Sequence, residues 1–284
     1  MIKVASLQMQ MVGDKAINLA KSEALVREAH AEGARIVLLP ELFEGLYFCK
    51  DMDKEYFSWA HERKEHPLLM HFSSLCKELE VVLLVSYFEK DEDLFYNALA
   101  VIDADGNILD NYRKTHIPDG PGYEEKFYFT PGDTGFKVWS TKFATIGAGI
   151  CWDQWFPETA RSLALMGAEL IFYPTAIGSE PEIKIDSKEH WQRVQMGHAA
   201  ANMVPVITAN RFGSEEGDSC SLTFYGSSFM TDITGKKIAE ASRDQEEILY
   251  AEYDLEKNKK LREYWALFED RRPEMYGEII KTQV

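Results

Sequence analysis

The chain has 284 residues, 45% of them apolar, enough for a substantial core in one large domain or two small ones. Its 47 acidic and 31 basic side chains give a formal net charge of −16, which argues against nucleic-acid binding because phosphates are held by clustered lysines and arginines. No apolar run approaches the roughly 18 residues of a membrane-spanning helix, and the N-terminal MIKVASLQMQ lacks the pattern of a signal peptide.

Apolar strand-like runs alternate with segments of helical period through the first half of the chain. The expected elements, in order, are a strand over 3–8, a helix over 18–34, a strand over 35–41, a helix over 66–80 and a strand over 81–89. Two extended runs then flank Asp105-Gly106, and an Asp-Gly pair is a strong signal for a β-hairpin.

The second half continues this alternation to the last strand. The expected elements are a strand over 143–150, a helix over 157–169, a strand over 170–176, a helix over 188–203, an extended run over 204–210, a hairpin over 223–242 and a strand over 246–254. No linker or repeat interrupts the pattern, so we expect one domain over 1–284, of the α/β class with mixed sheets covered by helices. We expect the C-terminal extension 255–284 to lie across this domain or across a partner subunit.

Three chemically reactive side chains follow apolar strands. Glu41 comes after IVLLP, Lys114 after NYR and Cys151 after IGAGI. Ligands and catalytic groups in α/β proteins gather at the carboxyl ends of strands. Each residue alone has an ordinary interpretation, because a charge at a strand end is usually solvated and a buried cysteine usually packs. The three together predict a catalytic site.

The chemistry of such a trio is coherent. A free thiol has a pKa of about 8.5, and a nearby ammonium favours the thiolate. A carboxylate can take the thiol proton, pass it to a leaving amine and later activate water. The ammonium of Lys114 and the backbone N–H of Trp152 could hold the oxyanion of a tetrahedral intermediate. Small residues at 147–149 and Pro157 suit a sharp turn that presents Cys151.

Other motifs do not support a competing chemistry. The histidines of HERKEH (61–66) are five residues apart, about 140° around a helix, whereas the zinc protease pattern needs four. GPG at 120–122 lacks the lysine of a phosphate-binding loop, and GICWD lacks the second glycine of a nucleophile elbow. A cysteine–histidine hydrolase with His116 or His198 stays open, although neither histidine has a local context that marks it as a base.

The four cysteines indicate the redox compartment. They stand at positions 49, 76, 151 and 220 and form no C-x-x-C pair. In a chain of this size, that spacing indicates reduced thiols, so we expect a cytoplasmic protein. The net charge and the lack of a long apolar run lead us to expect neither nucleic-acid nor membrane partners.

The reactive residues lie in motifs that resemble a known family. LLPELF around Glu41, YRKTHIP around Lys114 and GICWDQWFPE around Cys151 resemble the Glu–Lys–Cys triad of the nitrilase superfamily of carbon–nitrogen hydrolases. PELFEGLYFC, YRKTHIPDGPGYEEKFYFTPGDTGFKVW, YPTAIGSEP and FEDRRPEMY are similar to its N-carbamoylputrescine amidase branch, and the resemblance extends to about residue 277. It implies a four-layer α-β-β-α sandwich that forms homo-oligomers, dimers or larger. It also implies a second glutamate, at Glu125, that orients Lys114 and the substrate.

The stretch after the cysteine bears on the substrate. Relatives that cleave N-carbamoyl amino acids carry arginines here to clamp the substrate carboxylate, whereas this chain has Gln154 and Trp155. Acidic side chains that could instead pair with a substrate ammonium are Asp119, Asp153 and Glu180, of which we favour Glu180, in a loop after a strand. An acidic surface would also favour the approach of a cationic substrate.

The resemblance implies hydrolysis of N-carbamoylputrescine to putrescine, ammonia and carbon dioxide, a step of polyamine biosynthesis, without metal or organic cofactor. Cys151 would attack the ureido carbonyl and form an acyl-enzyme, with Glu41 as general base and then acid. The alternatives are an ω-amidase, an N-carbamoyl-β-alanine amidohydrolase, or a non-catalytic oligomeric scaffold. The first two need a cationic pocket, and the third predicts a degraded triad. The sequence leaves open which nitrogen leaves first and what Cys49, Cys76 and Cys220 do.

Overall fold

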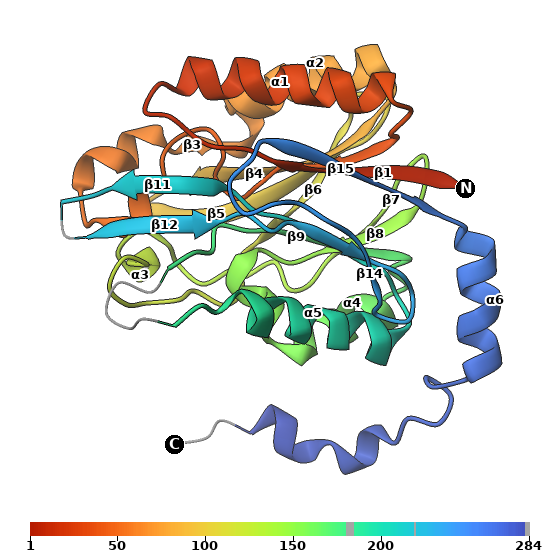
Figure 1. The fold of residues 1–284 in the computed structure, drawn as a ribbon. Coiled ribbons are helices and arrows are strands. Elements are labelled where there is room, and N and C mark those ends of the chain that lie inside the picture. Colours follow the sequence, from red (N-terminus) through yellow and green to blue (C-terminus); the bar gives the residue numbers. More distant parts are fainter. Residues whose placement is uncertain (180–184, 219, 282–284) are drawn as a thin grey trace.

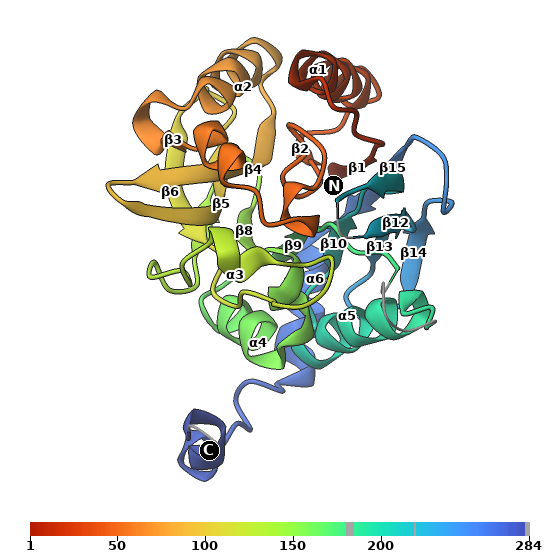
Figure 2. The same ribbon diagram turned by 90° about the vertical axis from the view of Figure 1, so that its left-hand side faces the viewer.

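Two β-sheets lie face to face between two pairs of helices in the computed structural model, which describes residues 1–179, 185–218 and 220–281 (Figure 1). The helices α1 (Lys15–Ala31) and α2 (Pro67–Leu79) cover one sheet, and α4 (Pro157–Leu165) and α5 (Lys188–Asn202) cover the other. Figure 2 shows the four layers from one end. This arrangement confirms the α-β-β-α sandwich that the resemblance implied.

The first sheet combines a parallel centre with antiparallel edges. Over the described residues its strand order is β15 (Glu247–Tyr253), β1 (Ile2–Gln8), β2 (Ile36–Leu38), β4 (Val82–Asp91), β5 (Leu94–Ile102) and β6 (Ile108–Arg113), with β3 (His61–Glu62) paired to β4. Strands β1, β2 and β4 run parallel because α1 and α2 provide the crossovers between them. The expected hairpin at Asp105-Gly106 joins β5 to β6.

The second sheet repeats this design. Its order over the described residues is β14 (Lys237–Glu240), β13 (Phe229–Thr231), β10 (Val206–Ala209), β9 (Leu170–Pro174), β8 (Thr145–Ala148) and β7 (Val138–Ser140). Strands β8, β9 and β10 are parallel, with α4 and α5 in the crossovers.

Three buried clusters of apolar side chains hold the layers together. Because side chains alternate along a strand, Val4 on β1 packs between the sheets with Leu84 and Phe172, whereas Leu7 packs under the helices with Phe72. A third cluster joins the second sheet to α4 and α5. Burial of this apolar surface is the main favourable contribution to folding.

The observed helix boundaries differ from the expected ones for local reasons. α1 begins at Lys15 and not at 18, because the Asp14 side chain accepts a hydrogen bond from the Ala16 amide at 2.9 Å and caps the helix. α4 ends at Leu165 and not at 169, and Gly167 follows with a φ of 99°, a conformation typical of helix termination.

The expected hairpin over 223–242 was wrong over its first half. Only β13 and β14 form that hairpin. The segment β12 (Ser221–Tyr225) pairs with β11 (Phe212–Glu216) in a separate two-stranded ribbon. The remaining short elements are η1 (Phe48–Lys50), η2 (Lys54–Trp59), η3 (Arg63–Glu65), α3 (Glu125–Tyr128), η4 (Cys151–Trp155), η5 (Pro273–Met275) and η6 (Gly277–Ile280).

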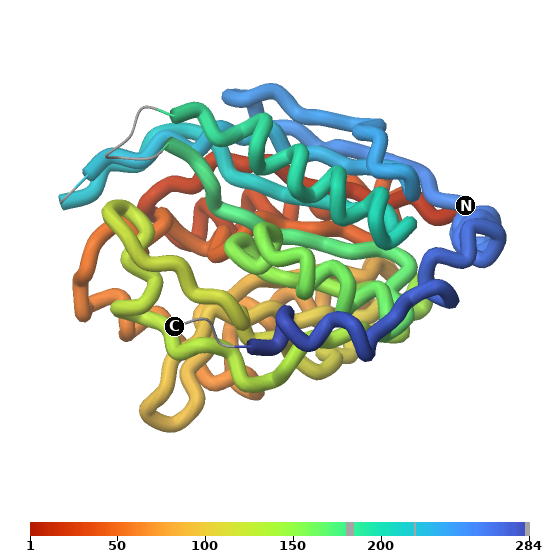
Figure 3. The backbone as a smooth tube through the Cα atoms, turned by 90° about the horizontal axis from the view of Figure 1, so that it is seen from below, coloured from red at the N-terminus to blue at the C-terminus, as the bar shows by residue number. Residues whose placement is uncertain are grey.

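The C-terminal segment leaves the sandwich. After α6 (Leu255–Trp265) the chain separates from the layers, as the ribbons of Figures 1 and 2 show, and the dark blue tube in Figure 3 shows it running back along the length of the molecule. The ring of Phe268 anchors its start, with the guanidinium carbon of Arg262 at 4.4 Å and that of Arg161 at 4.9 Å from the ring centre. Over the described residues, none of the helices combines the length and apolar character needed to cross a membrane.

Candidate active site

The structure gathers the strand-end residues from both sheets. Glu41 and Lys114 follow β2 and β6 of the first sheet, and Cys151 follows β8 of the second. The Lys114 Nζ atom lies 2.9 Å from Oε1 of Glu41, and both side chains are fully buried. Cys151 is 6% exposed and lines the same cavity as Glu125, whose carboxylate binds Lys114.

The turn that presents Cys151 depends on close packing. Cys151 has a φ of 42°, which is uncommon for a residue with a side chain. A Cβ atom on Gly149 would lie 2.9 Å from Cε1 of Tyr173 and 3.0 Å from Cβ of Asp153, so only glycine fits there. Asp153 accepts a hydrogen bond from the Ile150 amide at 2.8 Å and holds the first turn of η4.

Glu125 completes the charged group. It begins the short helix α3, is fully buried, and accepts hydrogen bonds from Lys114 Nζ at 2.6 and 2.8 Å. The Tyr47 hydroxyl donates to the same carboxylate at 2.8 Å. Lys114 is therefore held between Glu41 and Glu125.

Burial and charge set the protonation of these groups. Burial alone would lower the pKa of Lys114, but the carboxylates of Glu125 and Glu41 outweigh it and raise that pKa well above its ordinary value. Burial raises the pKa of Glu125 to about 7 although Lys114 opposes the shift. For Cys151, burial and the charge of Glu41 raise the thiol pKa well above its ordinary value, and Lys114 only partly offsets them. A raised thiol pKa favours the protonated form at rest, so a base such as Glu41 has to take the proton.

The Glu41 carboxylate has two unlike oxygens. Oε1 accepts from Lys114 and from Asn97 Nδ2, the latter at 2.7 Å. Oε2 is buried and has no hydrogen-bond partner among the described residues. This oxygen is available to take a proton.

Cys151 opens onto a cavity of about 350 Å3. Its described lining includes Trp152 and Trp155 of η4, Glu125 at the start of α3, and Asp119 and Tyr123 in the loop before α3. His190 of α5 also lines it, and no lysine or arginine does so among the described residues. This volume suits a small linear molecule.

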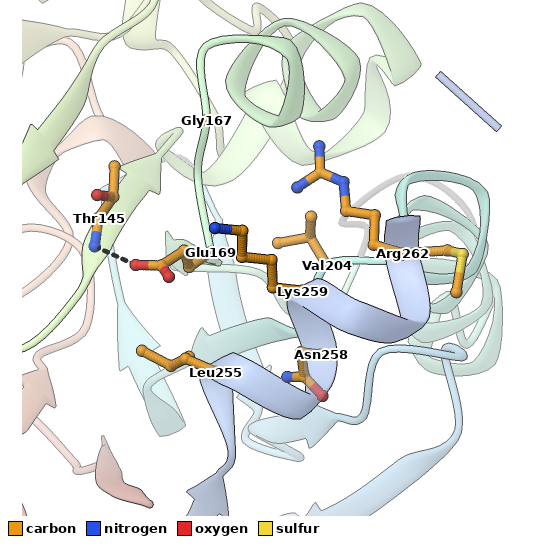
Figure 4. A pocket seen from close by; sticks show the side chains of 9 residues that line it. Thr145, Gly167, Glu169, Val204, Leu255, Asn258, Lys259 and Arg262 are labelled. Carbon is orange, nitrogen blue, oxygen red and sulfur yellow. Dashed lines mark hydrogen bonds between the residues drawn. The ribbon is translucent and has the colours of Figure 1, made fainter. Parts of the chain in front are cut away.

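A second cavity, of about 320 Å3, lies beside α6 (Figure 4). Lys259 and Arg262 line it together with Glu169, whose Oε2 accepts from the Thr145 amide at 2.7 Å. The described lining of this second cavity contains none of Glu41, Lys114 and Cys151. We therefore take the cavity at Cys151 as the candidate active site.

The three acidic candidates for substrate binding have different positions. Asp119 lines the cavity, with a side chain 48% exposed and 3.9 Å from Lys126 Nζ. Asp153 is fully buried and does not line the cavity. Its oxygens accept from Ile150, from the Tyr112 hydroxyl at 2.8 Å and from His116. Glu180 lies outside the described residues.

The two histidines of the alternative hydrolase are engaged elsewhere. His116 Nδ1 lies 2.7 Å from Asp153 Oδ1, and its ring stacks on Phe156. His198 Nε2 lies 2.9 Å from the Gln154 carbonyl oxygen. Neither lines the cavity. Within the described ranges, no group of three His, Cys, Asp or Glu side chains is arranged to hold a metal ion.

Sequence reasoning missed several residues that hold the site. Arg211 is fully buried and donates to the carbonyl oxygens of Glu41 at 2.7 Å and Leu42 at 3.0 Å, fixing the backbone where Leu42 adopts a φ of 46°. Tyr47 donates a hydrogen bond to the Glu125 carboxylate, and Asn97 donates one to the Glu41 carboxylate. The one available signal was a polar residue inside an apolar strand, as Asn97 is in FYNALAV.

Comparison with known proteins assigns the class. Residues 3–263 match the family model of the carbon-nitrogen hydrolases. The chain belongs to this family, the nitrilase superfamily, and is a hydrolase of carbon–nitrogen bonds.

Individual relatives include enzymes named for particular substrates and a solved structure. A citrullinase of Francisella tularensis subsp. tularensis is 54% identical over 281 residues, which cover 99% of this chain and 98% of the relative. An N-carbamoylputrescine amidase of Arabidopsis thaliana is 53% identical, covering 98% of this chain and 95% of the relative. The crystal structure of a carbon-nitrogen hydrolase from Helicobacter pylori G27 is 39% identical, with a TM-score of 0.93 and coverage of 100% of this chain and 99% of that one.

Proposed function

We propose that the protein hydrolyses N-carbamoylputrescine to putrescine, ammonia and carbon dioxide. The observation that carries this proposal is the cavity at Cys151, whose described lining includes Asp119 and Glu125, the partner of Lys114, but no lysine or arginine. N-carbamoylputrescine amidases of four plants, 52–53% identical to this chain over 94–95% of their own length, support the same substrate.

The chemistry follows from the protonation states. The Cys151 sulfur attacks the ureido carbonyl as its proton passes to Glu41, and Lys114 and the Trp152 amide stabilise the oxyanion. Glu41 returns the proton to the leaving nitrogen as the C–N bond breaks and an acyl-enzyme thioester remains. Water, deprotonated by Glu41, then attacks the thioester, and Glu41 returns that proton to the Cys151 sulfur as it leaves. The carbamic acid released decomposes to carbon dioxide and the second nitrogen product, so that ammonia and putrescine are both formed. Glu125 keeps Lys114 in place throughout.

The far end of the substrate meets aromatic and acidic groups. Trp152 and Trp155 offer faces for a butyl chain and for a cation. Asp119, and Glu180 outside the described residues, are the proposed partners of the terminal ammonium.

Citrulline is a second candidate, because a citrullinase is among the most similar relatives. It differs from N-carbamoylputrescine by a carboxylate on the carbon that bears the amine. A buried carboxylate needs a cationic partner, and the described lining contains neither lysine nor arginine. The site therefore favours the substrate without the carboxylate.

The test compares ammonia release from four substrates at equal concentration. We expect kcat/KM for N-carbamoylputrescine to exceed that for citrulline, N-carbamoyl-β-alanine and glutaramate by at least about tenfold, or about 1.4 kcal/mol. A Cys151→Ala variant serves as the inactive control. If kcat/KM for citrulline equals or exceeds that for N-carbamoylputrescine, the proposed substrate is wrong and citrulline takes its place.

We also propose that the C-terminal extension 255–284 binds a second copy of the chain in a cytoplasmic homo-oligomer. The arm exposes large apolar side chains, with Tyr264 at 85% and Ile280 at 86% exposure. All four cysteines are free thiols, which supports a reducing compartment. Light scattering should give a multiple of 32.5 kDa for the full chain and a lower mass for a chain ending at residue 266. A monomeric full chain would contradict the proposal.

A further inference from the structure

Asn97 lies between the two charged partners of the site. It sits on β5, between β4 and β6, and is fully buried. Its carbonyl oxygen accepts the Lys114 amide at 2.8 Å, just beyond the pairing of Ala98 with Arg113. Directly opposed residues of antiparallel strands point to one face, so the Asn97 and Lys114 side chains share a side of the sheet. Both reach Oε1 of Glu41.

The two donors leave the carboxylate in one orientation. A carboxylate can accept about four hydrogen bonds, and here both donors bind Oε1 while Oε2 has none among the described residues. A buried acceptor without a partner is costly and needs a reason. The reason fits the chemistry, because the thiol of Cys151 is protonated and its proton needs an unoccupied acceptor.

The choice of an amide is also informative. Without Asn97, the Glu41 carboxylate could rotate until both oxygens contact the Lys114 ammonium, and the free oxygen would be lost. A second cation at position 97 would prevent that rotation but would stabilise the charged carboxylate and weaken it as a base. A neutral donor fixes the orientation without adding charge.

We propose that Asn97 is a positioning residue that keeps Oε2 of Glu41 free to accept the Cys151 proton, and that its carbonyl oxygen aligns Lys114 from the same residue. The inference rests on the proposed roles of Glu41 and Cys151. It does not depend on which ureido substrate the enzyme prefers.

The test uses Asn97→Leu, with Asn111→Leu as a matched control. Asn111 is a buried asparagine on the neighbouring strand β6 that donates to another carboxylate, Glu89, at 2.8 Å. We expect Asn97→Leu to lower kcat by about 10- to 100-fold with KM within about threefold. Asn111→Leu should lose comparable thermal stability but keep kcat within about threefold.

Asn97→Asp gives a readout that a purely structural role would not. Two carboxylates in contact share a proton, so the introduced carboxyl group donates to Glu41 only when it is protonated. We expect the variant to lose activity at pH 8 and to recover part of it as the pH falls toward about 6, whereas wild type does not gain on that side. This readout also serves if the leucine variant fails to fold.

Folded Asn97 variants with wild-type kcat and an unchanged pH profile would overturn the inference, as would an equal loss of kcat in Asn111→Leu. Failure of the proposed function would look different. In that case wild type itself would release no ammonia from any ureido or amide substrate.

Discussion

Cys151 keeps its proton in the resting site, because burial and the Glu41 charge raise its pKa above the opposing effect of Lys114. Bond formation to the substrate must therefore coincide with loss of that proton. The rate then depends on where the acceptor oxygen of Glu41 points more than on the acidity of the thiol. Residues that orient Glu41 and the Cys151 turn become as important as the reacting groups.

Asp153→Asn tests whether Asp153 serves the turn or the substrate. Its carboxylate accepts four hydrogen bonds, from Tyr112, Ile150 and two groups of His116. An asparagine amide would place a donor against one of these donors, so we expect the free energy of unfolding to fall by about 1–3 kcal/mol. Steady-state kinetics should show kcat reduced at least about tenfold through loss of alignment, with KM within about threefold.

Asp119→Asn is the matched control, because Asp119 lines the cavity and is half-exposed. It should raise KM for the amine substrate and leave stability almost unchanged. A raised KM with normal stability in Asp153→Asn would instead assign substrate binding to Asp153.

At the scale of elements, periodicity predicted the strand and helix order because each element buries one regular face. The Asp-Gly turn located the β5–β6 hairpin, and proline marked the starts of α2 and α4. The ribbon of β11 and β12 was missed because β11 has only one buried position, Glu215, and so shows no apolar alternation. Periodicity and turn residues are local signals, and they do not specify which strand an extended segment will pair with.

The candidate site, like the fold, was predictable only where the sequence carries a local signal. Glu41, Lys114 and Cys151 stand out because a reactive residue ends an apolar strand. Glu125 lies in a helix of four residues with no periodicity of its own, so only the resemblance identified it. Asn97 acts through a contact 56 residues away in the chain, and no sequence pattern encodes such a contact.

The start of α2 carries a pH-dependent contribution to stability. His66, the residue before the helix, is fully buried, and burial lowers its pKa to about 4. The unfolded chain therefore binds a proton at higher pH than the folded chain. Stability is lost as the pH falls from about 6.5 to about 4, by at most about 3 kcal/mol.

We expect His66→Gln to remove this loss, because glutamine can donate to the Phe88 carbonyl oxygen, as His66 Nε2 does, without titrating. Urea unfolding at pH 7 and pH 4.5 measures it, and the contributions of all other groups cancel between the two proteins. His71→Gln, on the same helix and paired with Glu23, controls for a partly exposed histidine. An unchanged pH dependence in His66→Gln would contradict the assignment.

At the scale of the whole molecule, the site exists only because two sheets pack face to face. Glu41 and Lys114 come from one sheet and Cys151 from the other, so neither half of the sandwich contains the full set. The buried apolar cluster between the sheets fixes the distance between them. Because this cluster is closely packed, it also holds the residues of the site at fixed positions. The C-terminal segment after α6, by contrast, exposes apolar side chains, and none of its residues is in the described lining of the cavity at Cys151.

The net charge of −16 makes the approach of substrate dependent on ionic strength. N-carbamoylputrescine carries one positive charge, so the acidic surface raises its local concentration, and salt screens that attraction. We expect kcat/KM to fall by about three- to tenfold between 10 and 300 mM sodium chloride. N-pentylurea, which replaces the ammonium by a methyl group, is the neutral control and should show almost no dependence. If both substrates respond equally, salt acts on the protein itself, and the acidic surface has no part in selecting a cation.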